Sequence, residues 1–339
     1  MPEAGDDLPV DEFDWIASLR GLTRGDRRAL DLMDDAAVIP SRPGFDLVVS
    51  TDAQVEGVHF PAGEAPDIIA RRLLRTSLSD LAAKAAAPFG YFLTIAWPPG
   101  HGEAWRDRFR AGLAADGEAF GVALLGGDTV STTGPLTLDA TVLGWVEAGR
   151  AVLRSGARVG DALIVCGPIG SGRLGLMATR GEVEDPDETL AKHYRLPTPL
   201  LVLRAPLLAH VRACADVSDG LIADAGHIAE ANGLGLEIEI TDLPVSPAAA
   251  RWLQSQLDQK RARIALATGG DDYALACAVD PVSAASFIAE VEALGVPTRV
   301  AGQLTATPGL TVTFHGEPVD IDRAGWRHSD RAADLSVPP

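Results

Sequence analysis

Two neighbouring segments decide the fold of the first half of this chain: FDLVVSTDAQVEGVHF at residues 45–60 and PDIIARRLLRTSLSDLAAKAAAP at residues 66–88. The run from Phe45 to Ser50 is rich in β-forming residues and predicts a strand that ends at the polar Thr51 and Asp52. The second segment has the apolar spacing of a long helix closed by Pro88, so Asp80 is expected on that helix. A strand followed by a long helix predicts mixed α/β structure.

Helix and strand patterns alternate through the rest of the first half. Helices are expected at residues 11–22, an amphipathic segment, and at 103–120. Three further strands are expected at YFLTIAW (91–97), VALLGG (122–127) and LTLDATVLGWV (136–146). The first half is therefore expected to be α+β.

A change of composition at residues 149–160, GRAVLRSGARVG, marks the expected domain boundary. The division predicted from it is an N-terminal domain at 1–149, a C-terminal α/β domain at 150–330 and a tail at 331–339. In the second half, strands are expected at 161–167, 234–240, 262–266, 274–279 and 298–304. Helices are expected at 200–214, 221–231 and 283–294, and an irregular stretch at 181–192.

Composition limits the class of protein. The 339 residues are 47% hydrophobic and 22% charged, which is typical of a globular chain large enough for two domains. The formal net charge of -18 argues against a nucleic-acid partner, because a protein that pairs with phosphates usually presents a basic face. The only lysines are Lys84, Lys192 and Lys260, and no GxxxxGK[ST] segment is present, so a P-loop is excluded. Any bound phosphate must be met mainly by cations.

The cysteines and the N-terminal sequence bear on location. Cys166, Cys214 and Cys277 are far apart in apolar runs, which predicts buried core residues and neither a disulfide framework nor a zinc site. The first residues, MPEAGDDLPVDEF, lack the basic and apolar regions of a signal peptide, and no apolar run has the length of a spanning helix. We therefore expect a cytoplasmic protein with no membrane partner.

Acidic residues recur at the ends of the short apolar runs. Magnesium takes oxygen ligands, keeps several waters and binds through a few carboxylates together with substrate phosphates. Carboxylates from distant parts of the chain that converge on one place would provide such a site. The pattern therefore predicts a site for several magnesium ions, built from Asp34, Asp35, Asp52, Asp80, Asp128, Asp216, Asp219, Asp271 and Asp272.

Two short motifs could carry an aspartate to a bound phosphate. In DVSDG, capping of the next helix is the simpler role, but Asp216 and Asp219, three residues apart in one turn, are more than a cap requires. In GGDT, Gly126 and Gly127 allow a phosphate or base to approach the main chain, and Asp128 would then meet a cation. Taken alone, GGD also fits an ordinary hairpin turn.

The sequence GSGRLG at residues 170–175 matches a dinucleotide-binding fingerprint that follows a strand. The fingerprint requires an acidic residue after the next strand, about twenty residues further on, but that distance falls in a proline-rich and charged stretch. We therefore interpret GSGRLG as a tight strand-to-helix turn, one that could offer backbone amides to an anion.

Two isolated residues leave alternatives open. His59, in GVHF, fits either a core histidine with satisfied hydrogen bonds or a substrate contact. Arg154, in RSGA, fits either a surface arginine or a guanidinium fork for phosphate oxygens in a chain with few lysines.

The order of the motifs resembles that of the thiamine-monophosphate kinase family, over nearly the whole chain from Phe13 to Trp326. Seven motifs carry the resemblance: DDAAVI from Asp34, STDAQVEGVHF from Ser50, SLSDLAA from Ser77, GGDT from Gly126, RSGA from Arg154, DVSDGL from Asp216 and GGDDY from Gly269. It implies the α/β (α+β), two-domain PurM-like fold of the aminoimidazole-ribotide synthetase and selenophosphate synthetase superfamily. The N-terminal domain would form a β-barrel with its twin in a homodimer, and the C-terminal α/β domain would cover the active cleft.

The resemblance also implies roles for particular residues. Magnesium ions would be held by Asp35, Ser50, Thr51, Asp52, Asp80, Asp128, Asp216 and Asp219. ATP would be contacted by Gly126, Gly127, Asp128, Arg154 and Ser218. Thiamine monophosphate would be contacted by His59, Asp271 and Trp326, and the residues closest to catalysis would be Asp52, Asp216 and Asp219.

The implied reaction is direct transfer of the γ-phosphoryl group of ATP to the phosphate of thiamine monophosphate, giving thiamine diphosphate and ADP. The acceptor is already a phosphate anion, so alignment and charge neutralisation by magnesium would suffice without a strong general base. The chain departs from the family pattern at Met33, Ser77, Asp271 and Ala274, where glycine, asparagine, glutamate and a second glutamate are usual. Asp271 therefore carries a shorter side chain at an expected substrate contact.

Two other functions remain open at this stage. One is a different ATP-using enzyme of the same superfamily. Selenophosphate synthetase would require a reactive cysteine or selenocysteine near the N-terminus, and the hydrogenase-maturation protein a C-terminal cysteine, whereas this sequence has neither. The other is a non-catalytic sensor that binds magnesium and nucleotide.

Overall fold

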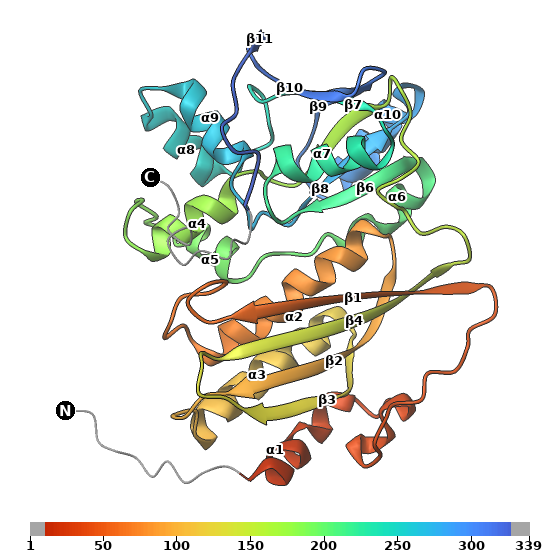
Figure 1. The fold of residues 1–339 in the computed structure, drawn as a ribbon, viewed down its shortest axis with the longest axis vertical. Helices are drawn as coiled ribbons and strands as arrows, with labels where there is room; N and C mark the ends of the chain where they lie inside the picture. The colour runs from red at the N-terminus through yellow and green to blue at the C-terminus, as the bar shows by residue number, and fades with distance from the viewer. Residues whose placement is uncertain (1–10, 327–339) are drawn as a thin grey trace. The chain divides into compact units, whose positions relative to one another are not determined.

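The computed structural model describes residues 11–326. The acidic first ten residues and the expected tail at 331–339 lie outside the described residues. The chain divides into two units, one formed by Met1–Leu81 and Ala87–Gly149 and the other by Ala82–Ala86 and Arg150–Pro339 (Figure 1). Each unit contains one β-sheet with its own helices.

The first unit is built on a four-stranded sheet in the order β1-β4-β2-β3. Its strands are β1 (Phe45–Val55), β2 (Ala87–Trp97), β3 (Ala123–Ser131) and β4 (Thr137–Glu147). β4 pairs antiparallel with both β1 and β2. β2 and β3 are parallel and are joined by the helix α3 (Glu103–Phe120), as a parallel pair requires a crossover connection.

Two long helices cover one face of this sheet (Figure 1). Helix α2 (Pro66–Ala83) is tied to β1 by a hydrogen bond of 2.9 Å from Gln54 Nε2 to Thr76 Oγ1. Helix α3 packs Phe109 against Trp97 of β2, with ring centroids 5.9 Å apart. The two helices cross closely at Gly112, where a Cβ atom would lie 2.4 Å from the carbonyl oxygen of Asp67. Before β1, the chain forms α1 (Glu12–Ser18) and the 3₁₀ helices η1 (Leu19–Thr23) and η2 (Arg27–Leu32).

The first unit differs from the sequence expectations mainly at the element ends. β1 continues to Val55, so Ser50 and Asp52 lie inside the strand and not at its end. β3 likewise runs through the GGD motif to Ser131. In both cases the polar residues remain in the strand because their backbone groups pair with a neighbouring strand. The sequence pattern alone does not show this pairing. The amphipathic helix expected at residues 11–22 stops at Ser18 and continues as η1. The long helix stops at Ala83, ahead of the left-handed Ala85.

The second unit contains a seven-stranded sheet in the order β11-β10-β7-β9-β5-β8-β6. The pairs β5–β8, β5–β9, β6–β8, β7–β9 and β10–β11 are antiparallel, and β7–β10 is parallel. The strands are β5 (Ala162–Cys166), β6 (Val211–Val217), β7 (Gly235–Glu239), β8 (Ala274–Val279), β9 (Thr298–Thr305), β10 (Gly309–Phe314) and β11 (Glu317–Pro318).

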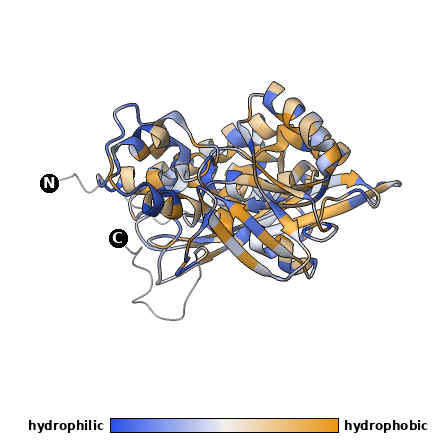
Figure 2. Ribbon diagram, turned by 90° about the horizontal axis from the view of Figure 1, so that it is seen from above, coloured by the Kyte–Doolittle hydropathy of each residue, from blue (hydrophilic) through white to orange (hydrophobic). Residues whose placement is uncertain are grey.

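The strands β5, β6 and β8 of this sheet are buried on both faces. Alternate residues of β5, β6 and β8 pack with α7 (Leu221–Ala231) in one core cluster, while the intervening residues pack with α6 (Arg204–His210) and α10 (Pro281–Ala293) in another. These strands therefore read as continuous apolar runs, and Figure 2 shows that many strand segments of the protein carry the orange colour of hydrophobic residues. The remaining helices of this unit are α4 (Ser171–Thr179), α5 (Thr189–Arg195), η3 (Leu201–Leu203), α8 (Pro247–Ser255) and α9 (Gln259–Ala267).

Two predictions in the second unit were wrong. The helix expected at residues 200–214 ends at His210, and the last four residues begin β6, because pairing with β8 outweighs their local helical pattern. The strand expected at 262–266 lies inside α9, whose N-terminus is capped by Asp258 accepting from the Arg261 N–H at 2.9 Å. The stretch at 181–192, expected to be irregular, includes the start of α5. The sequence patterns did not indicate α5, α8, β10 or β11.

The expected mixed α/β class and the buried cysteines are confirmed. All three cysteines are free and buried, and the Sγ atoms of Cys214 and Cys277 lie 3.7 Å apart. The expected dimeric β-barrel stays a prediction, because the sheet of the described first unit is open, with β1 and β3 at its edges. Within residues 11–326, none of the helices has the length and apolar character needed to cross a membrane.

Candidate active site

In the first unit, three of the predicted metal-binding residues lie between β1 and α2. Side chains alternate along β1, so Ser50 and Asp52 share the face of Gln54, which contacts α2. Asp80 comes from α2, and its Oδ2 atom accepts a hydrogen bond from Ser50 Oγ at 2.5 Å. A strand and a helix thus bring together oxygen atoms that could ligate a metal ion, from residues 30 positions apart in sequence.

Thr51 and Asp128 lie on the other face of the same sheet. Thr51 Oγ1 donates to Asp139 Oδ2 and contacts Thr141 Oγ1, each at 2.9 Å. The strand register aligns Asp128 on β3 with Ala53 on β1, through Thr94 and Asp139 on the strands between them. Asp52 is aligned with Gly127, the residue before Asp128, and neighbouring residues of a strand point to opposite faces. Asp52 and Asp128 therefore occupy opposite faces, three strand spacings or roughly 14 Å apart along the sheet. The first unit of one chain does not bring these two carboxylates together.

Asp35 and His59 lie outside the regular elements of the first unit. Asp35 is exposed in a bend that follows η2. His59 follows β1, and its Nδ1 atom accepts a hydrogen bond of 3.0 Å from the Val55 N–H. In the neutral imidazole, the proton is therefore on Nε2.

In the second unit, two predicted motifs meet because β6 and β8 are neighbouring strands. DVSDG begins with the last two residues of β6 and continues into the loop after it, and GGDDY leads into β8. The backbone N–H of Asp271 donates to the Ser218 carbonyl, and that of Tyr273 donates to the Val217 carbonyl, each at 2.8 Å. Asp216 is buried at the end of β6, with 6% of its surface exposed. Ser218, predicted to contact the nucleotide, and Asp271, predicted to contact the substrate, thus lie on two adjacent loops that are hydrogen-bonded to each other.

Trp326 and Arg154 join the same group. The Trp326 N–H donates to the Asp219 carbonyl at 2.8 Å. The RSGA loop is held by Asn232, which donates to the Arg154 carbonyl at 2.9 Å and accepts from the Gly156 N–H at 2.7 Å. The second unit therefore gathers Asp216, Ser218, Asp219, Asp271 and Trp326 around the loops at the ends of β6 and β8, while the backbone of Arg154 is bound at the C-terminal end of α7.

Asp224, in the first turn of α7, supports the DVSDG loop and was not predicted from the sequence. Its Oδ2 atom accepts from the backbone N–H groups of Asp219 and Gly220, at 3.0 and 3.1 Å. Burial, followed by the nearby charge of Asp219, raises the pKa of Asp224 to about 7, while Arg154 lowers it. Arg154 therefore lies close enough to influence the carboxylates of this loop.

Asp272, one of the acidic residues in the predicted magnesium pattern, instead supports the GGDDY loop. It is 2% exposed, and its two oxygens accept from the N–H groups of Gly170 at 2.7 Å and Gly172 at 2.9 Å. These amides belong to GSGRLG, at the start of α4. The acceptor at this helix N-terminus is thus the buried carboxyl group of Asp272, which agrees with our interpretation of GSGRLG as a turn and not a dinucleotide fingerprint.

The backbone around Asp271 is strained and tightly packed. Asp271 and Tyr273 have left-handed φ values of 66° and 50°, which L-residues adopt only when their surroundings enforce them. Gly172 permits this arrangement, because a Cβ atom there would lie 2.3 Å from the Asp271 carbonyl group. The hydroxyl of Tyr273 donates to Asp271 Oδ1 at 3.0 Å, so the loop also orients the expected substrate contact.

Two sequence signals could have revealed the supporting aspartates. Asp224 stands in the first turn of a predicted helix, directly after DVSDG, where a carboxylate stabilises free N–H groups. GSGRLG offers amides to an anion, and Asp272 is the neighbour of a predicted site residue. Over residues 11–326, no three His, Cys, Asp or Glu side chains lie close enough together to hold a metal ion.

Comparison with known families covers nearly the whole chain. The family model described as AIR synthase related protein, N-terminal domain, matches residues 33–146. The model described as AIR synthase related protein, C-terminal domain, matches residues 158–315. The two matched regions contain every predicted site residue except Arg154 and Trp326.

Relatives of known name are similar along their full length. Thiamine-monophosphate kinase of Caulobacter vibrioides is 53% identical over 94% of this chain and 91% of its own. The enzyme of the same name from Escherichia coli K12 is 35% identical over 94% of this chain and 98% of its own.

Solved structures show the same fold. Thiamine-monophosphate kinase from Stenotrophomonas maltophilia K279a has a TM-score of 0.79 and 32% identity, covering 92% of this chain and 98% of its own. AaThiL complexed with AMPPCP and TMP has a TM-score of 0.74 and 25% identity, covering 94% and 97%. E. coli HypE, with a TM-score of 0.72 and 21% identity over 95% and 99%, shares the fold alone.

Proposed function

Because the chain belongs to the thiamine-monophosphate kinase family, we propose that it transfers the γ-phosphoryl group of ATP to thiamine monophosphate, giving thiamine diphosphate and ADP. The observation that carries this function is similarity to enzymes of that name along the full length of both chains. The relative complexed with AMPPCP and TMP supports ATP and thiamine monophosphate as the two substrates, since AMPPCP is an ATP analogue. The family resemblance of the seven sequence motifs is confirmed.

The described residues suit magnesium. Ser50, Asp52 and Asp80 provide only oxygen donors, the type that magnesium prefers. Asp80 makes no ion pair within residues 11–326, and its carboxylate accepts a hydrogen bond only from Ser50, so a half-buried negative charge is left for a cation to neutralise. When bound, magnesium would neutralise phosphate charge and hold the reacting groups in line.

We assign the remaining metal contacts by family resemblance. Asp216 and Asp219 would hold magnesium from the second unit, and Asp35, Thr51 and Asp128 would contribute from the first. Among these, Asp216 is the most buried, and the loop that carries Asp219 is held in place by Asp224. The contacts of Asp224 keep the backbone of this loop in place before any ligand binds, which favours cation binding by the side chains it carries.

The nucleotide would contact Gly126, Gly127, Asp128, Arg154 and Ser218. Gly127 has no alternative residue, because a Cβ atom there would lie 1.9 Å from the Leu93 carbonyl oxygen. Glycine is thus required here by the pairing of β3 with β2, and its exposed backbone would also be open to a phosphate or base. Arg154 would provide a planar guanidinium for phosphate oxygens.

Thiamine monophosphate would contact His59, Asp271 and Trp326. With Nδ1 engaged by the Val55 N–H, His59 would present Nε2–H as a donor to the substrate. Asp271 would accept a hydrogen bond through the carboxylate that Tyr273 orients. These contacts place the acceptor phosphate, itself a nucleophile, and proton abstraction by the protein is not required.

A homodimer is supported by two observations on the first unit. β1 is an edge strand, and Leu47 and Val49 on its outer face are 42% and 53% exposed, an apolar surface that a second copy would cover. In one chain, Asp52 and Asp128 lie on opposite faces of the sheet, so a second copy is the natural source of an Asp128 near Asp52. The cytoplasmic location and the absence of membrane and nucleic-acid partners stay predictions.

The test is a product assay on the purified chain with ATP, magnesium and thiamine monophosphate. We expect one thiamine diphosphate and one ADP per turnover, and a loss of orders of magnitude in kcat for Asp52→Asn with an unchanged circular dichroism spectrum. Asp258→Asn, which alters only the cap of α9, is the matched control and should keep full activity. ATP binding without any thiamine diphosphate would instead indicate the sensor, and a different phosphorylated product would indicate another enzyme of the superfamily.

A further inference from the structure

Helix α7 contacts both of the loops that carry predicted nucleotide residues in the second unit. At its N-terminal end, Asp224 accepts hydrogen bonds from the backbone of the DVSDG loop. At its C-terminal end, Asn232 follows the last helical residue and contacts the RSGA loop. At about 1.5 Å per residue, Asp224 and Asn232 are separated by about 12 Å along the helix axis. One helix therefore sets the distance between the two loops.

The side-chain amide of Asn232 is fully engaged with main-chain atoms. Its Nδ2 atom donates to the Arg154 carbonyl at 2.9 Å and to the Ile228 carbonyl at 2.7 Å, and its Oδ1 atom accepts from the Gly156 N–H at 2.7 Å. The opposite orientation of the amide would place its oxygen against two carbonyls, so these bonds fix it in one orientation. The bond to Ile228 holds the amide on α7, and the other two hold the RSGA backbone.

The RSGA loop also lies against the edge strand β6. The Cys214 N–H donates to the Leu153 carbonyl at 2.8 Å, and a Cβ atom at Gly156 would lie 2.6 Å from the Arg212 carbonyl oxygen. Gly156 has a φ of 115°, which residues with a side chain rarely adopt. The backbone of Arg154 is thus held from two sides, by β6 and by α7, although Arg154 itself remains exposed.

The charge of Arg154 acts toward the opposite end of α7. Burial raises the pKa of Asp224 in the first turn of this helix, and the Arg154 guanidinium opposes the shift, although the Arg154 carbonyl is bound at the helix C-terminus. Asp224, Ile228 and Asn232 follow at intervals of four residues, so they lie near one face of α7. The Arg154 side chain therefore extends along this face toward the DVSDG loop, where Ser218 is expected to contact the nucleotide.

From these contacts, we propose that Asn232 is a positioning residue for nucleotide binding: its amide fixes the RSGA loop on α7, so that Arg154 meets the phosphates of a nucleotide held at the DVSDG loop. This role rests on the proposed kinase function, since ATP is taken as the nucleotide. A guanidinium whose backbone is fixed before the ligand arrives loses less conformational entropy on binding. Asn232 would not touch the nucleotide, so its effect passes through Arg154.

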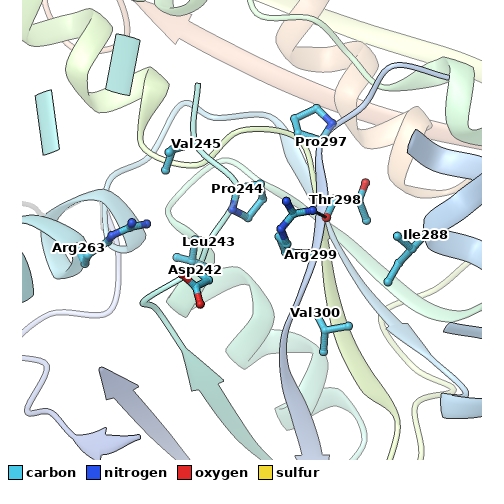
Figure 3. Close-up of a pocket in the computed structure, with 10 residues that line it drawn as sticks. All are labelled: Asp242, Leu243, Pro244, Val245, Arg263, Ile288, Pro297, Thr298, Arg299 and Val300. Carbon is cyan, nitrogen blue, oxygen red and sulfur yellow. Dashed lines mark hydrogen bonds between the residues drawn. The ribbon is translucent and has the colours of Figure 1, made fainter. Parts of the chain in front are cut away.

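A double-mutant cycle tests this role, with binding of AMPPCP in the presence of magnesium measured by isothermal titration calorimetry. The four proteins are wild type, Asn232→Ala, Arg154→Gln and the double variant. Glu230→Ala, which changes an 82% exposed side chain in the last turn of α7, is the control for the helix. Arg299→Gln removes a positive charge at a different pocket of the same unit (Figure 3) and is the control for net charge. Urea denaturation measures the stability of each variant.

We expect Arg154→Gln to weaken AMPPCP binding about tenfold or more and Asn232→Ala about fivefold, with the KM for thiamine monophosphate unchanged in both. In the Arg154→Gln background, Asn232→Ala should have no further effect, a coupling that lost stability alone would not produce. Both controls should bind like wild type. Unchanged affinity in Asn232→Ala, or equal weakening by Asn232→Ala with and without Arg154, would overturn the positioning role.

Separate outcomes distinguish this role from the kinase reaction. A wild-type chain that shows the coupling but forms no thiamine diphosphate would contradict the reaction and still support positioning by Asn232. Turnover by wild type without coupling between Asn232 and Arg154 would contradict the positioning role alone. Absence of AMPPCP binding to wild type would contradict both.

Discussion

The hydroxyl of Tyr273 donates a hydrogen bond of 3.0 Å to Oδ1 of Asp271. Asp271 stands where the family usually has glutamate, so its carboxylate has a shorter reach toward the substrate. Both residues have left-handed backbone conformations, and their N–H groups are bound by the carbonyls of Ser218 and Val217. The short carboxylate is thus held in one orientation by its own loop, which reduces the entropy lost when substrate binds.

Removing that hydroxyl should weaken substrate recognition. We expect Tyr273→Phe to raise the KM for thiamine monophosphate about fivefold, which corresponds to one hydrogen bond of about 1 kcal/mol, with little change in kcat or in the KM for ATP. Steady-state kinetics measure this effect. Tyr91→Phe is the control, since the Tyr91 hydroxyl is buried without a hydrogen-bond partner and its loss should not reduce activity or stability. Equal KM values for wild type and Tyr273→Phe would contradict the positioning role.

Two helical glycines should respond in opposite ways to alanine. Gly172→Ala places a Cβ atom 2.3 Å from the Asp271 backbone, so we expect a loss of at least about 2 kcal/mol in the free energy of unfolding and a raised KM for thiamine monophosphate. Gly226→Ala, in α7, meets no atom within 4 Å and should raise the free energy of unfolding by about 0.5–1 kcal/mol. Urea denaturation measures both values. Similar effects of the two substitutions would show that the contact between Gly172 and the Asp271 loop is not rigid.

Stability should depend on pH through Asp272. Burial raises the pKa of this carboxyl from 3.8 to about 8, while the N–H groups of Gly170 and Gly172 oppose the shift. Between about pH 4 and pH 8 the unfolded chain loses this proton before the folded chain does, so the contribution of Asp272 to stability falls as pH rises. Asp272→Asn cannot titrate.

The free energy of unfolding of wild type, minus that of Asp272→Asn, should therefore decrease from pH 5 to pH 8. Urea denaturation of both proteins at several pH values measures this difference. A difference that grows with pH would mean that the backbone N–H groups outweigh burial and keep the carboxylate ionised.

The outer face of β1 should control the oligomeric state. We expect the wild-type chain, of 35.4 kDa, to elute as a dimer in size-exclusion chromatography with light scattering. Val49→Glu should shift it toward the monomer, because a charge would be buried at the interface. Val282→Glu, at a position that is 91% exposed on α10, should remain dimeric. A wild-type monomer, or a Val49→Glu variant that stays dimeric, would contradict the proposed homodimer.

Local patterns predicted the elements that have strong periodicity. The helices at 103–120 and 221–231 and the strand at 274–279 occupy the predicted residues, because their apolar spacing and flanking turns agree with their tertiary packing. The segment at 211–214 did not follow its local pattern, since its pairing with β8 is a contact more than 60 residues away in sequence.

The candidate site shows the same limit. The motifs indicated which residues could bind cations and phosphates, but not which face of the sheet each would occupy. Ser50 contacts Asp80, whereas Asp128 lies on the opposite face of the sheet. This difference depends on the register between paired strands, which cannot be read from the residues one at a time. The role of Asp272 also requires a contact across about a hundred residues, to Gly170 and Gly172.

The most direct test of the proposed function follows the phosphoryl group itself. The purified chain is incubated with magnesium, thiamine monophosphate and ATP labelled with ³²P at the γ-position, and the label is traced in the products and on the protein. Direct transfer predicts that the label appears in the terminal phosphate of thiamine diphosphate, with an equal amount of ADP and none bound to the protein. Label found only in inorganic phosphate, or formation of AMP in place of ADP, would contradict it.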